Sequence, residues 1–134
     1  MTDIEIAKSN LEGHSICLCR KGEIITDDGR GISPLMRFIA EGRDLSGYSA
    51  ADLIVGKAAA MLFVKVGIVC VYGKTMSESG KTFLEKRGIP CTYDVLTYKI
   101  INRQGTDICP MEKTVTEIDD AEEGYDALRL RLEE

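Results

Sequence analysis

The sequence has little of the chemistry that metal sites and nucleophilic triads commonly use. It contains a single histidine, His14, which stands before the first expected strand without a plausible ligand or nucleophile partner nearby in the sequence. This scarcity argues against a histidine-built zinc site and against a serine nucleophile activated by histidine. We therefore expect His14 to be a turn residue.

The chain also has no excess of cations and no long apolar run. A formal net charge of -5 argues against nonspecific nucleic-acid binding. The longest apolar run, residues 58–64, is too short to cross a bilayer. The first residues, MTDIEIAKSN, have neither the basic nor the apolar region of a signal peptide. These features predict a cytoplasmic protein with no nucleic-acid or membrane partner.

The cysteines do not form a recognisable framework. Their number, five, is odd, and the one close pair, Cys17 and Cys19, has no second pair that would complete a tetrahedral zinc site. We expect reduced, structural thiols, no bound metal and no cofactor. With 134 residues, 44% of them hydrophobic, the chain is predicted to form one domain over residues 1–134.

The first third of the chain predicts a helix, a hairpin and a second helix. Thr2-x-x-Glu5 has the pattern of a capping box. Residues 15–20 and 23–26 are expected to form strands joined by a turn at Lys21-Gly22. Ser33-Pro34 then opens a helix that Gly42 ends.

The rest of the chain alternates helices and strands. A helix capped by Ser49 or Asp52 is expected to run to about Val66, followed by a buried strand over residues 67–73. Ser77 or Ser79 caps the next helix, and strands follow at 91–95 and 97–101. A turn, a helix opened by Cys109-Pro110 and an acidic terminal helix complete the chain. This order predicts an α/β fold, a three-layer α/β/α arrangement around a mixed sheet.

The order of elements resembles the cytidine-deaminase-like fold: a hairpin, a helix starting near residue 55, the strand GIVCVYG, a helix starting near residue 77, and a further strand. Active members carry H-x-E and P-C-x-x-C at the starts of those two helices, where they bind zinc. Here these positions read VGKA (55–58) and TMSESGK (75–81). Neither carries the zinc ligands, which argues against zinc-dependent deamination.

Four segments resemble a narrower family. GRGISPLMRFIAEG, ADLIVGKAAAM, YGKTMSESG and INRQGTDICPME are similar to signature segments of a small family of uncharacterised prokaryotic proteins. That family is described as having a deaminase-like fold without the zinc motif. The resemblance implies a fold and no activity.

Lys57 stands alone among apolar residues, and two interpretations apply. It is either a surface lysine whose stem packs while its ammonium stays in water, or part of a site for a small anionic or nucleotide-like ligand. The second interpretation places it at a helix N-terminus beside the ends of parallel strands, and anion binding is favoured over a nucleophilic lysine. Asp52 either caps the same helix, stabilising it by roughly 1 kcal/mol, or holds Lys57 charged.

The remaining candidate residues lie at two later helix starts. Ser77 and Ser79 either cap their helix or bind the same anion as Lys57. Cys109 and Glu112 either cap and pack or act as nucleophile and general acid/base. Asn102 and Arg103 precede them in a polar turn and are counted with the ligand-binding candidates.

Two functions are compatible with these residues. The first is a ligand-binding module for a small anionic or nucleotide-like molecule near Lys57. The second is a metal-independent enzyme that uses Cys109, Glu112 and Lys57. The apolar helix and the acidic terminal helix are also compatible with a homodimer.

Overall fold

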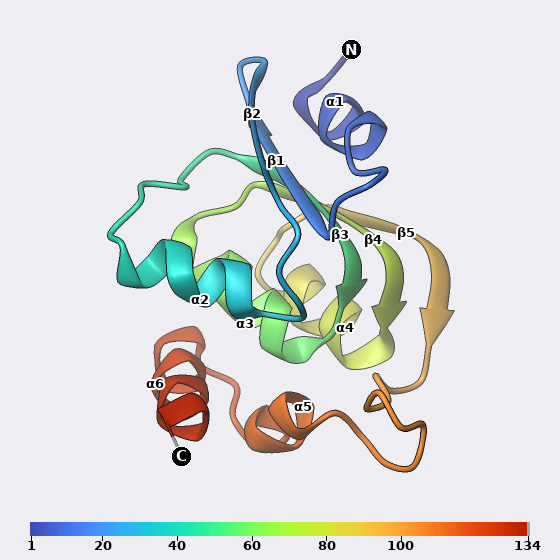
Figure 1. The fold of residues 1–134 in the computed structure, drawn as a ribbon, viewed down its shortest axis with the longest axis vertical. Coiled ribbons are helices and arrows are strands. Elements are labelled where there is room, and N and C mark those ends of the chain that lie inside the picture. The colour runs from blue at the N-terminus through green and yellow to red at the C-terminus, as the bar shows by residue number, and fades with distance from the viewer. Residues whose placement is uncertain (134) are drawn as a thin grey trace.

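Five strands form one open sheet in the computed structural model, which describes residues 1–133. Their order across the sheet is β2-β1-β3-β4-β5 (Figure 1). β1 is antiparallel to both neighbours, whereas β3, β4 and β5 are mutually parallel, so the sheet is mixed as predicted. The strands are β1 Ile16–Arg20, β2 Glu23–Asp27, β3 Ser49–Val55, β4 Cys70–Ser77 and β5 Cys91–Thr97.

Helices flank both faces of this sheet. Alternate residues of β1 point to opposite faces: Ile16 and Leu18 belong to the larger core, while Cys17 and Cys19 lie in a smaller cluster with residues of α1. The other helices lie on the side of the larger core. Within residues 1–133 the helices are α1 Asp3–Ser9, α2 Ser33–Ala40, α3 Lys57–Val66, α4 Glu78–Lys86, α5 Pro110–Val115 and α6 Ala121–Glu133.

The helix, hairpin and second helix predicted for the first third of the chain are confirmed, but Ser33 is the first residue of α2 and not its N-cap, which is Ile32. Thr2 and Glu5 form a reciprocal capping box at the start of α1. Lys21 and Gly22 have φ angles of 50° and 80° and close the β1–β2 hairpin. This is the left-handed region that a tight hairpin turn requires.

The helix expected over residues 49–66 is wrong in its first half. Residues 49–55 form β3, which pairs with β1 on one side and β4 on the other. Asp52 lies opposite Ile16 and Gly73 in the sheet and caps no helix, and Ser49 is likewise in the strand. The N-cap of α3 is Gly56. Strand pairing on both sides has overridden the helix propensity of an alanine-containing segment.

Two strand boundaries also differ from the prediction. β4 begins at Cys70 and continues through Gly73 to Ser77, so the glycine does not end the strand. A Cβ atom at Gly73 would lie 2.9 Å from Val55 Cγ2, and this close approach is the reason for glycine there. The strand expected over residues 97–101 does not form, because β5 ends at Thr97 and Ile101 makes only an isolated bridge to Ile108.

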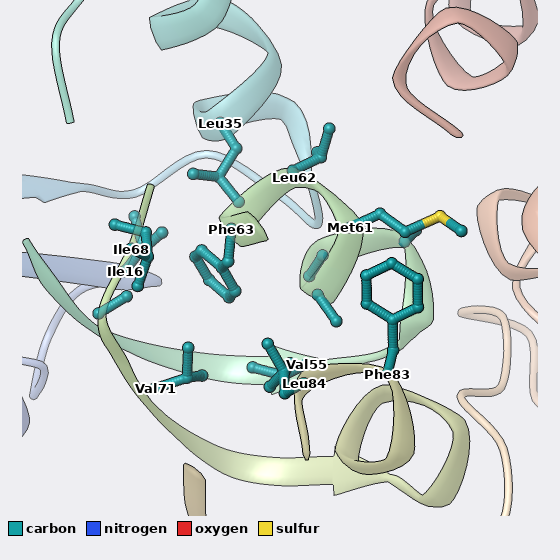
Figure 2. Packing of buried hydrophobic residues seen from close by; sticks show 14 of the residues in the cluster. Ile16, Leu35, Val55, Met61, Leu62, Phe63, Ile68, Val71, Phe83 and Leu84 are labelled. Carbon is teal, nitrogen blue, oxygen red and sulfur yellow. The ribbon is translucent and has the colours of Figure 1, made fainter. Parts of the chain in front are cut away.

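The larger core lies between the sheet and α3. Six consecutive residues of α3, from Ala58 to Phe63, are buried, because α2, α4 and α6 surround the helix. Figure 2 shows Phe63 extending from α3 toward the sheet, where Val55 and Val71 lie. Among residues 1–133, no helix has the length and apolar character needed to cross a membrane.

Candidate functional site

The candidate site lies beyond the carboxyl ends of β3, β4 and β5, which point to the same edge of the sheet (Figure 1). Two adjoining cavities open there, of about 230 Å³ and about 360 Å³. Both are lined by Lys57, Glu78 and Ser79. The first is completed by Tyr98, Lys99, Ile100, Ile108, Glu112 and Thr116. The second is completed by Thr82, Phe83, Lys86, Arg87 and Asp119.

Lys57 is the first residue of α3, and only 12% of its side chain is exposed. Its Nζ donates to the backbone oxygen of Thr116 and to Asp119 Oδ1, each at 3.2 Å. Both acceptors belong to the connection between α5 and α6. The ammonium therefore ties this connection to the start of α3 while lining both cavities.

Glu112 of α5 supplies the N-terminal cap that α3 lacks locally. Its Oε1 accepts a hydrogen bond from the backbone N–H of Lys57 at 2.7 Å, and its Oε2 accepts one from Ala58 at 2.8 Å. The residue at the N-cap, Gly56, has no side chain, and a Cβ atom there would collide with the Glu112 carboxylate. Burial raises the pKa of Glu112, while the two backbone hydrogen bonds and the nearby Lys57 lower it.

The start of α4 lies against the start of α3. Ser77 is the N-cap of α4, and its Oγ accepts from the backbone N–H of Gly80 at 3.0 Å, so one of the two predicted caps is confirmed. Ser79 Oγ lies 3.2 Å from Ser77 Oγ and faces the cavities. A Cβ atom at Gly80 would lie 2.9 Å from the backbone carbon of Gly56, so only glycine allows this approach.

Three of the other predicted residues do not line the cavities. The linings just described do not include Asn102, Arg103 or Cys109. Asn102 Oδ1 accepts from the backbone N–H of Thr106 at 3.0 Å, which closes the polar turn. Cys109 is the N-cap of α5 and its backbone N–H donates to the oxygen of Ile100 at 2.9 Å.

Asp52 is buried in β3, outside both linings, with 7% of its surface exposed. Its Oδ1 accepts from the backbone N–H of Ile54 at 3.3 Å. Burial raises its pKa to about 7, although backbone hydrogen bonds from Ile54 and Leu53 act in the opposite direction. The predicted pairing of Asp52 with Lys57 is replaced by the Lys57–Asp119 ion pair.

Several residues of the second cavity were not predicted as site residues. Thr82, Phe83 and Lys86 follow the predicted Ser79 on one face of α4 at helical spacing, which is the signal that could have found them. The Arg87 guanidinium lies 3.6 Å from the centroid of the Phe83 ring and donates to the backbone oxygen of Asp119. No sequence signal indicates that Asp119 is near.

Basic side chains outnumber acidic ones by one in the lining of the second cavity. Within residues 1–133, no three His, Cys, Asp or Glu side chains are grouped in a way that could hold a metal ion. The second cavity is lined by three basic side chains, Lys57, Lys86 and Arg87, and by two acidic ones, Glu78 and Asp119. This arrangement can attract an anion through charge and hydrogen bonding.

The fold and the site together define a mixed α/β domain with adjoining cavities at the carboxyl ends of its parallel strands. The model of a family described as a domain of unknown function (DUF1893; TM1506) matches residues 6–132. The chain therefore belongs to the DUF1893 family.

A solved structure agrees with this assignment. A DUF1893 family protein from Thermotoga maritima, TM1506, is similar to the chain with a TM-score of 0.78 and 27% sequence identity. The similarity covers 90% of this chain and 80% of that one. No curated protein matches the chain closely enough to count as a relative.

Proposed function

We propose that the chain is a binding module for a small anionic or nucleotide-like ligand, which occupies the two adjoining cavities. The observation that carries the proposal is the Lys57 ammonium, which is largely buried yet lines both cavities at the carboxyl edge of the parallel strands. Open α/β sheets commonly bind ligands at this edge.

The charges of the second cavity support an anion rather than a cation. Lys86 has no hydrogen-bond or ion-pair partner among residues 1–133, so its ammonium is available to a ligand. Arg87 uses one donor on the Asp119 backbone oxygen, and a guanidinium has five. Both groups can therefore bind an anion without breaking an existing ion pair.

The anion would bind through side chains and not through the N-terminus of α3. The first two backbone N–H groups of α3 already donate to Glu112. A ligand would have to displace this buried carboxylate to reach them. Lys57, Lys86, Arg87 and Ser79 offer donors without that displacement.

The deaminase-like relationship is part of the same proposal. Its support is the order of elements: a hairpin, β3, α3, β4, α4 and β5 follow one another, with α3 and α4 starting at the cavities. In this relationship, the positions where active deaminases hold zinc would correspond to residues 55–58, which include Lys57, and to the first turn of α4. An ammonium group would take the place of the metal as the local positive charge.

Thermal shift measurements with inorganic phosphate, pyrophosphate and a panel of nucleotides test the proposal. At least one anion should raise the melting temperature of the wild-type protein, and Lys57→Met should reduce that shift because it removes the shared charge. Because Lys57 also holds the α5–α6 connection, Lys86→Ala provides a second variant, at a side chain that makes no hydrogen bond or ion pair within residues 1–133. Lys74→Ala, on β4 outside both linings, is the matched control.

The proposal fails if no anion stabilises the wild-type protein more than it stabilises the Lys57→Met and Lys86→Ala variants. An equal loss of stabilisation in Lys74→Ala would also contradict it, since that result would indicate a general effect of net charge.

A metal-independent enzyme that uses Cys109, Glu112 and Lys57 is the second candidate function. The observation in its favour is that Glu112 lines the first cavity beside Lys57 and has a raised pKa, as a general acid requires. The role of Cys109 is tested by labelling with iodoacetamide across a pH series. Half-maximal labelling near pH ~8.5, as for an ordinary thiol, would contradict a nucleophilic role.

A further inference from the structure

The two cavities differ in the chemistry of their walls. Beyond the shared residues, the first cavity presents the apolar and aromatic side chains of Tyr98, Ile100 and Ile108, together with Lys99, Glu112 and Thr116. The second presents Lys86 and Arg87, together with Thr82, Phe83 and Asp119. One site therefore has an apolar, aromatic end and a cationic end, joined where Lys57, Glu78 and Ser79 line both cavities.

We infer that the ligand is a small molecule in which an aromatic ring is joined to an anionic group. The ring would occupy the first cavity and the anion the second. This inference rests on the ligand binding proposed above and deepens it by naming the class of ligand and its orientation in the site.

Apart from Glu78, the charged groups of the first cavity are already engaged within the protein, Lys57 by its ion pair with Asp119. Glu112 accepts from two backbone N–H groups of α3. The Lys99 ammonium lies 5.2 Å from the centroid of the Tyr98 ring, on one face of the aromatic system. What remains for a ligand is mostly the apolar surface of Tyr98, Ile100 and Ile108, and Tyr98 is 72% exposed. An exposed ring of this kind favours stacking on another aromatic group.

The second cavity has unengaged positive charge. Lys86 makes no hydrogen bond, ion pair or ring contact within residues 1–133, and it lies on the same face of α4 as Thr82 and Phe83. Arg87 is held in place by its stacking on Phe83 at 3.6 Å. A fixed guanidinium beside an unpaired ammonium suits a phosphate or carboxylate group.

Glu78, which lines both cavities, adds a requirement for the chemistry of the ligand. It lies in the first turn of α4, lines both cavities, and has no hydrogen-bond or ion-pair partner among residues 1–133. A free carboxylate accepts hydrogen bonds from N–H or O–H donors. The ligand should therefore carry such donors between its ring and its anionic group.

The size of the cavities limits the ligand. Ligand sites commonly measure about 300–1,000 Å³, and the cavities here measure about 230 Å³ and about 360 Å³. The first cavity alone is below this range and the second lies near its lower end, so the two together suit one small ligand. A molecule of the size of a nucleoside monophosphate fits both better than a dinucleotide does.

Isothermal titration calorimetry with four probes tests the inference: inorganic phosphate, adenosine, phenyl phosphate and adenosine monophosphate, all at one ionic strength. Adenosine monophosphate and phenyl phosphate should each bind at least about 10-fold more tightly than phosphate, because each adds a ring to the anion. Adenosine monophosphate should also bind more tightly than adenosine, which lacks the anion.

Three variants assign the ends of the probe to the two cavities. Tyr98→Ala should weaken both aromatic phosphates by roughly 3- to 10-fold and leave phosphate unchanged. Lys86→Ala should weaken all three phosphates. Glu78→Gln should weaken adenosine monophosphate, whose ribose hydroxyls lie between ring and phosphate, more than phenyl phosphate. Tyr93→Ala and Lys74→Ala, outside both linings, are the matched controls.

The outcomes separate this inference from the proposed function. If phosphate binds and Lys86→Ala weakens it, but neither aromatic phosphate binds more tightly than phosphate, the inference is overturned and anion binding stands. The inference is overturned in the same way if Tyr98→Ala and Tyr93→Ala have equal effects. If no probe binds the wild-type protein, the inference and the proposed function both fail.

Discussion

The interior of the sheet and its β5 edge are built differently. In β1, an inner strand, four of five residues are buried, because the strand has a neighbour on each side and helices over both faces. In β5, at the edge, Val95 is 54% exposed and Leu96 39%. The comparison indicates that the interior supplies stability, while the edge and the segment after it leave apolar surface exposed beside the first cavity.

The largest expected effect comes from removing a core side chain that packs on the interior of the sheet. Phe63→Ala should lower the free energy of unfolding by about 3–5 kcal/mol, because Phe63 is fully buried in α3. Val95→Ala, at the edge, should lower it by less than about 0.5 kcal/mol. Urea denaturation of both variants measures the difference. Equal losses in the free energy of unfolding would contradict the conclusion that the interior of the sheet supplies more stability than the β5 edge.

A smaller loss in the free energy of unfolding is expected where the N-termini of α3 and α4 meet. Gly80→Ala should destabilise the protein by about 1–3 kcal/mol, because the added methyl group meets the backbone of Gly56, which cannot move freely. At Gly124 of α6 the added group meets the flexible side chain of Met61. Gly124→Ala is therefore the control, and denaturant midpoints should rank it closer to the wild type. The reverse ranking would show that the contact of α3 with α4 is not tight.

A buried acid in the interior should make stability depend on pH. The pKa of Asp52 is raised from 3.8 to about 7 in the folded protein. Between these values the folded state retains a proton that the unfolded state has lost, so the contribution of Asp52 to stability falls as the pH rises through this window. Asp52→Asn removes this dependence.

A difference measurement between Asp52→Asn and the wild type isolates Asp52 from the other acids. The stability of Asp52→Asn relative to the wild type should rise by roughly 1 kcal/mol between about pH 5 and about pH 6. Denaturation curves at several pH values measure the change. A constant difference across this range would mean that Asp52 is ionised throughout and that burial does not raise its pKa.

The smallest effect on stability is expected at the edge, where binding should change instead. Asp119 pairs with Lys57, but its side chain is 91% exposed, so Asp119→Asn should alter stability by less than about 0.5 kcal/mol. Because the substitution removes a negative charge from the second cavity, it should raise the affinity for phosphate by about 2- to 5-fold. Calorimetry at low salt measures this, and unchanged affinity would contradict binding of the anion in the second cavity near Asp119.

Local signals predicted the elements whose boundaries are set by nearby residues. The capping box at Thr2, the turn at Lys21-Gly22 and the cap at Ser77 all depend on residues within a few positions of one another. The mixed sheet followed from the same local pattern. These features could be predicted from the sequence because their physical causes are local.

The elements decided by distant partners could not be predicted in this way. Residues 49–55 were predicted as the start of a helix, because the sequence of this segment gives no signal of its pairing with β1 and β4. Of the candidate site residues, Lys57, Ser79 and Glu112 line the first cavity, whereas the linings do not include Cys109 or Asn102. Glu112 was predicted to act at the start of its own helix, α5. Its hydrogen bonds to α3 span more than fifty residues of sequence, so no local pattern indicates them.

The remote cap on α3 has a consequence for how the chain matures. During synthesis on the ribosome, Lys57 and Ala58 are added well before Glu112, which follows Lys57 by 55 positions. Until α5 arrives, the opening turn of this helix can be satisfied only by water. The late part of the polypeptide therefore completes the middle of the domain, and a nascent chain that stops before α5 would keep this turn frayed and hydrated.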